Sequence, residues 1–128
     1  MQSGLRVLVV DDHPINRLVM TELFTQLGCA VTEAEDGEQA LSMSSAETFD
    51  LICLDRHMPG LSGDEVLSRL PDEQFVMAWS TDLCDLPERF NGVLAKPITL
   101  ASAQAALEKA VARRAAQAPR FPRLRRTG

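Results

Sequence analysis

One short stretch near the middle of the chain constrains the fold more than any other. Residues 51–54 (LICL) form an apolar run of strand length that ends on Asp55, and Pro59-Gly60 then turns the chain into a loop. A carboxylate directly after a buried strand is typical of open α/β sheets, which bind ligands outside the carboxyl ends of their strands. The stretch therefore predicts a parallel sheet with Asp55 at its ligand-binding edge.

The rest of the chain alternates between strand-like and helix-like segments. Further apolar runs of strand length lie at residues 5–10, 30–34, 75–79 and 93–95. Helical spacing and helix-end signals predict helices over about residues 14–27, 38–45, 63–70 and 99–117. In the first helix the apolar face consists of Ile15, Leu18, Val19, Leu23 and Leu27. This alternation predicts an α/β fold with helices on both faces of a parallel sheet.

The connection between the fourth and fifth strands is short. Only 15 residues separate Ser80 from Lys96, whereas a crossover with its helix needs about 10–12 residues before strand residues are counted. Pro87 and Asn91-Gly92 interrupt this segment further. We therefore expect the fourth helix to be missing or reduced to one or two irregular turns.

Length, composition and charge favour one globular domain. The chain has 128 residues, of which 45% are hydrophobic, and no apolar run approaches the roughly 20 residues of a membrane helix. The N-terminus lacks a signal-peptide pattern, and the cysteines (Cys29, Cys53, Cys84) predict neither disulfides nor a zinc site, so we expect a cytoplasmic domain.

Residues 1–118 carry nine basic and 18 acidic side chains, which does not suit nucleic acid. Residues 119–128, with four arginines and no acid, are expected to be a basic tail or linker.

Polar and charged residues follow four of the predicted strands. Asp11 and Asp12 follow the first strand, Asp55 the third, Ser80 the fourth and Lys96 the fifth. Because the carboxyl ends of parallel strands share one edge, we expect these side chains to converge. Converging carboxylates repel one another, and Mg²⁺ with oxygen ligands relieves that repulsion. Asp55 would then be a nucleophile for phosphoryl transfer, with Lys96 supplying charge and Ser80 a hydrogen bond.

The combination of these residues resembles a known family. Over about residues 5–118 the chain is similar to the receiver domains of two-component response regulators. The resemblance is carried by Asp11-Asp12, the loop from Asp55 through Met58-Pro59-Gly60 to Gly63, Ser80 after an apolar strand, and Lys96-Pro97. It implies a flavodoxin-like (CheY-like), doubly wound five-stranded parallel sheet with strand order 2-1-3-4-5.

The resemblance also implies a chemistry and partners. Asp55 would be phosphorylated by a histidine kinase or a histidine phosphotransfer domain. Mg²⁺ would be held by Asp12, Asp55 and the backbone carbonyl of His57, with Asp11 assisting mainly through water. Residues 11–17 resemble receivers joined to hybrid sensor histidine kinases, so a covalently linked kinase or effector domain is expected. We do not expect this domain to contact a membrane.

Two positions depart from the family pattern. Ser80 stands where threonine is commoner, and Val93 stands where the family usually has a Tyr or Phe that swings inward on phosphorylation. With a shortened fourth helix as well, the usual signalling surface formed by helix 4, strand 5 and helix 5 is altered. We therefore hypothesise that output runs through the loop at residues 81–91.

Three functions remain open at this point. The first is a phosphoacceptor module that catalyses only its own phosphorylation and dephosphorylation, and is not an enzyme with a metabolite substrate. The second is a protein-interaction module of the same fold that works independently of phosphorylation. The third is a Mg²⁺-dependent phosphatase of the haloacid dehalogenase type, which needs an Asp where this chain has His57. We expect both histidines, His13 and His57, to face solvent, and Trp79 to be half-buried in a packing role.

Overall fold

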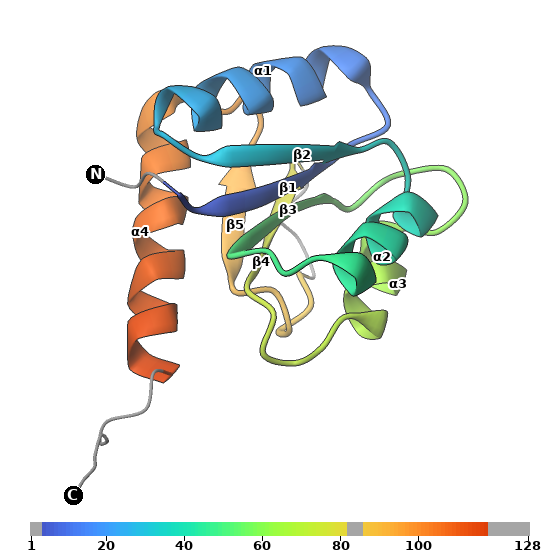
Figure 1. Ribbon diagram of the computed structural model, residues 1–128. Helices are drawn as coiled ribbons and strands as arrows, with labels where there is room; N and C mark the ends of the chain where they lie inside the picture. Colours follow the sequence, from blue (N-terminus) through green and yellow to red (C-terminus); the bar gives the residue numbers. More distant parts are fainter. Residues whose placement is uncertain (1–3, 82–85, 118–128) are drawn as a thin grey trace, which may run out of the picture.

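Five strands and four helices make up the described part of the chain, residues 4–81 and 86–117 of a computed structural model (Figure 1). The strands are β1 (Arg6–Val10), β2 (Ala30–Ala34), β3 (Leu51–Asp55), β4 (Val76–Ser80) and β5 (Gly92–Ala95). The helices are α1 (Pro14–Gln26), α2 (Gly37–Ala46), α3 (Gly63–Arg69) and α4 (Leu100–Gln117). None of them has both the length and the apolar character of a membrane span. The predicted tail at residues 119–128 lies outside the described residues.

All five strands pair in parallel, in the order β2-β1-β3-β4-β5. This confirms the predicted strand order. Every residue of β3 and β4 is buried, because helices cover both faces of the sheet. Burial on both faces explains why these strands are continuous apolar runs and do not alternate with polar residues.

The helices form one layer on each face of the sheet (Figure 1). On one face, α1 and α4 pack against Val7 and Val9 of β1 and the equivalent side chains of the neighbouring strands. On the other face, α2 and α3 pack against Leu8 and Val10. Successive residues of each strand therefore enter different cores, as the period of two requires.

Local signals place the ends of the helices. Pro14 is the first residue of α1, and Gly28, just after its end, has φ 87°, a conformation that glycine adopts readily. At the start of α3, Ser62 accepts a hydrogen bond from Glu65 N–H, and the Glu65 side chain accepts one from Ser62 N–H. This capping box fixes the start of α3 directly after the loop that follows Asp55.

The predicted apolar face of α1 is only partly correct. Leu23 and Leu27 pack against the core beside the fully buried Met20 and Phe24, but the other three predicted side chains are exposed. Their exposed fractions are 70% for Ile15, 55% for Leu18 and 42% for Val19. The reason is geometric: Met20, Phe24 and Leu27 lie at helical spacings of four and three and form the buried stripe, and the three exposed residues lie outside that stripe.

The connection from β4 to β5 contains no helix among its described residues, Thr81 and 86–91. The prediction of a shortened or missing fourth helix is confirmed to that extent, while residues 82–85 lie outside the described part. Phe90 is buried and Leu86 partly buried, and both join the core on the α2 and α3 face. Asn91 then exchanges two hydrogen bonds with the backbone of Val76, 2.8 Å each, and leads into β5.

Candidate functional site

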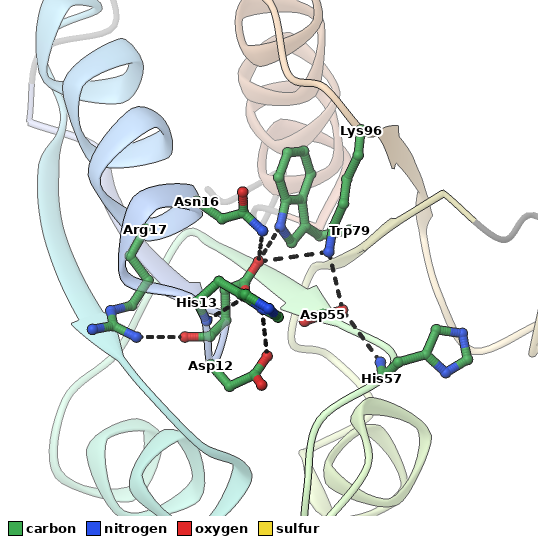
Figure 2. A network of polar contacts seen from close by, with 9 residues as sticks. Asp12, His13, Asn16, Arg17, Asp55, His57, Trp79 and Lys96 are labelled. Atoms are coloured by element: carbon green, nitrogen blue, oxygen red, sulfur yellow. Dashed lines mark hydrogen bonds and ion pairs between the residues drawn. The ribbon is translucent and has the colours of Figure 1, made fainter.

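The carboxyl ends of four strands bring the predicted site residues to one edge of the sheet. The strand register places Asp55 beside Trp79 and Ser80 beside Ala95, so β3, β4 and β5 end close together. Figure 2 shows Asp55 and Lys96 converging there, with Asp12 close by. Asp11 Oδ2 lies 3.7 Å from the Lys96 Nζ. Ser80 is buried at the last position of β4.

Asp55 is buried, with 2% of its surface exposed. Its Oδ1 accepts a hydrogen bond from the backbone N–H of His57 at 3.2 Å and lies 3.5 Å from the Lys96 Nζ. The start of α3 packs directly on this strand end, because a Cβ on Gly63 would lie 2.2 Å from the Asp55 carbonyl oxygen. Only glycine fits at that position without a shift of the backbone.

Asp11 is fully buried and its carboxylate is held by donors from several elements. Oδ1 accepts the backbone N–H of His13 at 2.8 Å. Oδ2 accepts the side-chain N–H of Asn16 at 3.1 Å and the indole N–H of Trp79 at 2.6 Å. These bonds fix the orientation of the Asp11 carboxylate.

Lys96 joins the two buried carboxylates. Its Nζ lies 3.5 Å from Asp55 Oδ1 and 3.7 Å from Asp11 Oδ2, and 5.3 Å from the centroid of the Trp79 ring. The side chain is 22% exposed, so solvent screens these ion pairs only partly. Lys96 precedes Pro97 through a cis peptide bond at the end of β5.

The two buried carboxyl groups have opposite pKa shifts. Burial raises the pKa of Asp55, and the nearby negative charge of Asp11 raises it further, while the His57 N–H and Lys96 act in the opposite direction. Burial acts on Asp11 as well, but its pKa is lowered overall by the His13 N–H, the Trp79 indole, the charge of Lys96 and Asn16. Asp11 is therefore the more firmly ionised of the pair.

Asp12 and His13 form the solvent side of the site. The Asp12 side chain is 26% exposed, and His13 Nδ1 lies 3.2 Å from Asp12 Oδ1 and 3.4 Å from Asp11 Oδ1. Ligand atoms of these three residues all lie within 4.8 Å of one another, close enough to share an ion. Two carboxylates suit a hard cation such as Mg²⁺, whereas His13, 69% exposed, faces solvent as expected. The His57 ring is exposed too.

A family comparison identifies this arrangement. Residues 7–111 match the family model described as the response regulator receiver domain. The chain belongs to this family. The match spans all five strands, so the carboxylates and the lysine described above occupy the strand ends of a receiver domain.

Similar proteins agree with this assignment. The receiver domain is 32% identical over 137 residues to the virulence sensor protein BvgS of Bordetella pertussis, which covers 94% of this chain and 11% of BvgS. It is 36% identical over 109 residues to the sensor protein EvgS of Escherichia coli K12, covering 78% of this chain and 9% of EvgS. The chain thus spans about a tenth of the length of these relatives.

Solved structures show the same fold. The receiver domain of the hybrid histidine kinase CckA has a TM-score of 0.71 and 29% identity with this chain. That comparison covers 83% of this chain and 98% of the CckA domain. The flavodoxin-like fold implied by the sequence resemblance is confirmed.

Sequence reasoning missed Trp79 as a member of the site. The expectation of a half-buried packing residue is wrong, because Trp79 is 2% exposed and its indole donates to Asp11. A signal was present in the strand period: Val7 and Val9 of β1 share a core with Met77 and Trp79 of β4, and continuing β1 by two residues puts Asp11 on that same face.

Two arginines next to the site were also missed. Arg17 donates to the Asp11 backbone carbonyl at 2.7 Å and to Glu33 at 3.2 Å, and so ties α1 to the end of β1 and to β2. Arg56, buried directly after Asp55, donates twice to the Asp64 carboxylate, at 3.1 Å each. This bidentate pair anchors the loop after Asp55 to the first turn of α3.

Two cavities border the site. One, of about 260 Å³, lies between α1 and the segment after β5 and is lined by Trp79, Lys96, Asn16 and apolar side chains that include Val19 and Ile98. The other, of about 560 Å³, has a strongly acidic lining with Asp12, Glu35, Asp36 and Glu38. The surface around Asp12 is therefore negative and favours cations.

Proposed function

We propose that this receiver domain accepts a phosphoryl group on Asp55 from a phosphohistidine of a histidine kinase or a histidine phosphotransfer domain. A carboxylate oxygen of Asp55 bonds to phosphorus while the P–N bond of the phosphohistidine breaks and the imidazole nitrogen keeps the electron pair. Hydrolysis later bonds a water oxygen to phosphorus and returns the free carboxylate. The observation that carries the proposal is a buried aspartate at the end of β3, 3.5 Å from a lysine, in a chain of this family.

We propose Mg²⁺ as the cofactor of this transfer. The donor set supports it, because Asp12, Asp55 and the His57 backbone carbonyl offer oxygen ligands and Asp11 a further carboxylate that can act through water. Bound Mg²⁺ would supply positive charge against the oxygens of the transferred group. The raised pKa of Asp55 supports the same assignment, since a nearby cation would favour the ionised nucleophile.

The other predicted residues have supporting roles in this proposal. Lys96 pairs with Asp55 before transfer and with a phosphoryl oxygen after it, so that its charge remains paired throughout. Ser80, buried at the end of β4, would donate its hydroxyl hydrogen to a second phosphoryl oxygen. We propose that the domain catalyses only its own phosphorylation and dephosphorylation.

The protein partner would approach across α1. Ile15, Leu18 and Val19 are exposed apolar side chains on the helix that follows Asp11 and Asp12, and Val19 also lines the cavity beside Lys96. Such side chains suit the apolar face of a partner helix that carries the phosphohistidine. The likeness to the receiver domain of the hybrid histidine kinase CckA supports a histidine kinase as the source of the phosphoryl group.

A small phosphodonor tests the proposal directly. The 128-residue chain is incubated with acetyl phosphate and Mg²⁺, and its intact mass and the fluorescence of its one tryptophan are followed. We expect one phosphoryl group on the wild type, none on Asp55→Asn, and normal phosphorylation of Asp72→Asn, whose carboxylate is fully exposed. An unmodified wild-type chain, or equal modification of Asp55→Asn, would overturn it.

A second candidate keeps the fold but not the phosphorylation. It is favoured by Val93, which replaces the switch aromatic, and by the absence of a helix among the described residues between β4 and β5. A module of this kind would bind its partner equally well as wild type and as Asp55→Asn, with or without acetyl phosphate. A phosphorylation-dependent affinity would exclude it.

A further inference from the structure

Trp79 makes an unusual connection across the sheet. It lies on β4, yet its indole N–H reaches the carboxylate of Asp11, which follows β1, and β3 runs between these two strands. Neighbouring strands are about 4.8 Å apart, so the indole, the hydrogen bond and the Asp11 side chain together bridge roughly 10 Å. Leucine is too short for this distance, and phenylalanine would supply the ring without a donor. The position thus uses both the length and the N–H of tryptophan.

The hydrogen bond from Trp79 matters because three groups contact the same carboxylate oxygen of Asp11. Its Oδ2 lies 2.6 Å from the Trp79 donor, 3.1 Å from the Asn16 donor and 3.7 Å from Lys96 Nζ. Lys96 is at nearly the same distance from Asp55, 3.5 Å. A buried carboxylate that loses one hydrogen bond attracts its remaining partners more strongly. Loss of the indole donor would therefore draw Lys96 toward Asp11 and away from Asp55.

We propose that Trp79 is a positioning residue of the phosphoacceptor site: its indole N–H holds Asp11 and thereby keeps Lys96 balanced between Asp11 and Asp55. The inference rests on the proposed function, since the consequence of this balance is measured at Asp55. The Trp79 ring also lies beneath the Lys96 Nζ, 5.3 Å from it, which limits where the ammonium group can settle. Trp79 acts through Asp11 and Lys96, because its indole N–H donates to Asp11 and its ring faces the Lys96 Nζ.

The first test separates the N–H from the ring. Trp79→Phe keeps a buried aromatic ring and removes the donor. Phe75→Leu is the matched control, because Phe75 is buried just before β4, at the end of the strand opposite to Asp55 and Lys96. We expect the rate of Asp55 phosphorylation by acetyl phosphate, measured by intact mass, to fall about tenfold in Trp79→Phe. It should remain within about twofold of wild type in Phe75→Leu.

A double-mutant cycle shows whether the effect passes through Asp11. In an Asp11→Asn background, adding Trp79→Phe should lower the rate by less than about twofold, because the charged acceptor is already gone. A merely structural role would give the same factor in both backgrounds. Equal factors, or a Trp79→Phe rate equal to that of wild type, would overturn the proposal.

The third measurement needs neither phosphorylation nor a Trp79 variant. The chain has one tryptophan, so its ¹H–¹⁵N spectrum contains one indole N–H resonance. We expect this resonance to move upfield in Asp11→Asn, since a neutral amide is a weaker acceptor, and to stay in place in Asp72→Asn. An unmoved resonance in Asp11→Asn would refute the contact. If wild type took up no phosphoryl group, the proposed function would fail, while this measurement would still decide whether the Trp79 indole N–H binds Asp11.

Discussion

Replacing Gly63 by alanine tests how tightly the nucleophile's strand is joined to α3. The added Cβ would lie 2.2 Å from the Asp55 carbonyl oxygen, 2.7 Å from the Arg56 Cα and 2.9 Å from the Asp55 carbonyl carbon. Ordinary contacts begin at 3.4 Å, so the start of α3 or the end of β3 must move by about 1 Å. Overpacking typically costs about 1–3 kcal/mol, and contact with backbone atoms favours the upper end.

Alanine has a better helix propensity than glycine, but this offsets only about 0.5–1 kcal/mol of the overpacking cost. We therefore expect Gly63→Ala to lower the free energy of unfolding by about 2 kcal/mol or more. Urea unfolding followed by Trp79 fluorescence and circular dichroism would show a midpoint lower by about 1 M. In the fraction that remains folded, the shift at Asp55 should slow phosphorylation by acetyl phosphate at least tenfold, because a displacement of about 1 Å disturbs the reacting geometry.

Gly60→Ala is the matched control in the same loop. Gly60 has φ 78°, but its added Cβ would meet nothing within 4 Å, so the cost is limited to about 1–2 kcal/mol of backbone strain. We expect Gly60→Ala to unfold at a higher urea concentration than Gly63→Ala and to be phosphorylated at a rate close to wild type. A Gly63→Ala variant as stable and as reactive as Gly60→Ala would refute this reasoning.

Three further substitutions test the electrostatics of the site by urea unfolding. The pKa of Asp55 is higher in the folded chain than its unfolded value of 3.8, so folding favours the protonated carboxyl group. The contribution of Asp55 to the free energy of unfolding is therefore fully present below pH 3.8 and is lost as pH rises through the folded pKa. Asp55→Asn should therefore raise the free energy of unfolding by about 1 kcal/mol at pH 7 and leave it unchanged at acid pH. An equal increase at both pH values would contradict the raised pKa of Asp55. Lys96→Met leaves two buried carboxylates without their cation, so the free energy of unfolding should fall by about 3 kcal/mol at pH 7. Part of this loss should be restored in the Asp55→Asn/Lys96→Met double variant, and additive changes would argue against the ion pairs. Arg56→Met breaks the bidentate pair with Asp64 and should lose about 2 kcal/mol, more than Arg69→Met on the exposed side of α3, and equal losses would exclude a role for the pair.

The parallel sheet and the convergence of the site could be predicted from the pattern of the strands, whereas the strand order was implied by the family resemblance. Apolar runs buried on two faces mark the parallel strands, and residues directly after them share the carboxyl edge. Asp11, Asp55 and Lys96 each come within a residue of a strand end, and the structure brings them within ion-pair distance as expected. The short connection before β5 was predictable from the number of residues between Ser80 and Lys96 and from the Pro87 and Asn91-Gly92 that interrupt them.

The features that could not be predicted depend on distances between elements. The exposed side of α1 follows from where the helix axis lies over the sheet, which leaves Met20 and Phe24 inward and Leu18 outward. The bond from Trp79 to Asp11 joins residues 68 apart in sequence and needs two side chains that meet over the strand between them. Apolar spacing carries no information on either point.

The shared face of the strands makes the site sensitive to register as well as to residue type. Val9, Cys53, Met77 and Leu94 lie in one core, and the residues two positions later, Asp11, Asp55, Trp79 and Lys96, continue the same face. Deleting one residue within β4 would turn the following side chains to the opposite face. Such a chain would still contain every functional residue, and it would lose the contact to Asp11 all the same. Scans that exchange residues one by one leave this property untouched, whereas a set of single-residue deletions along the strands would reveal it.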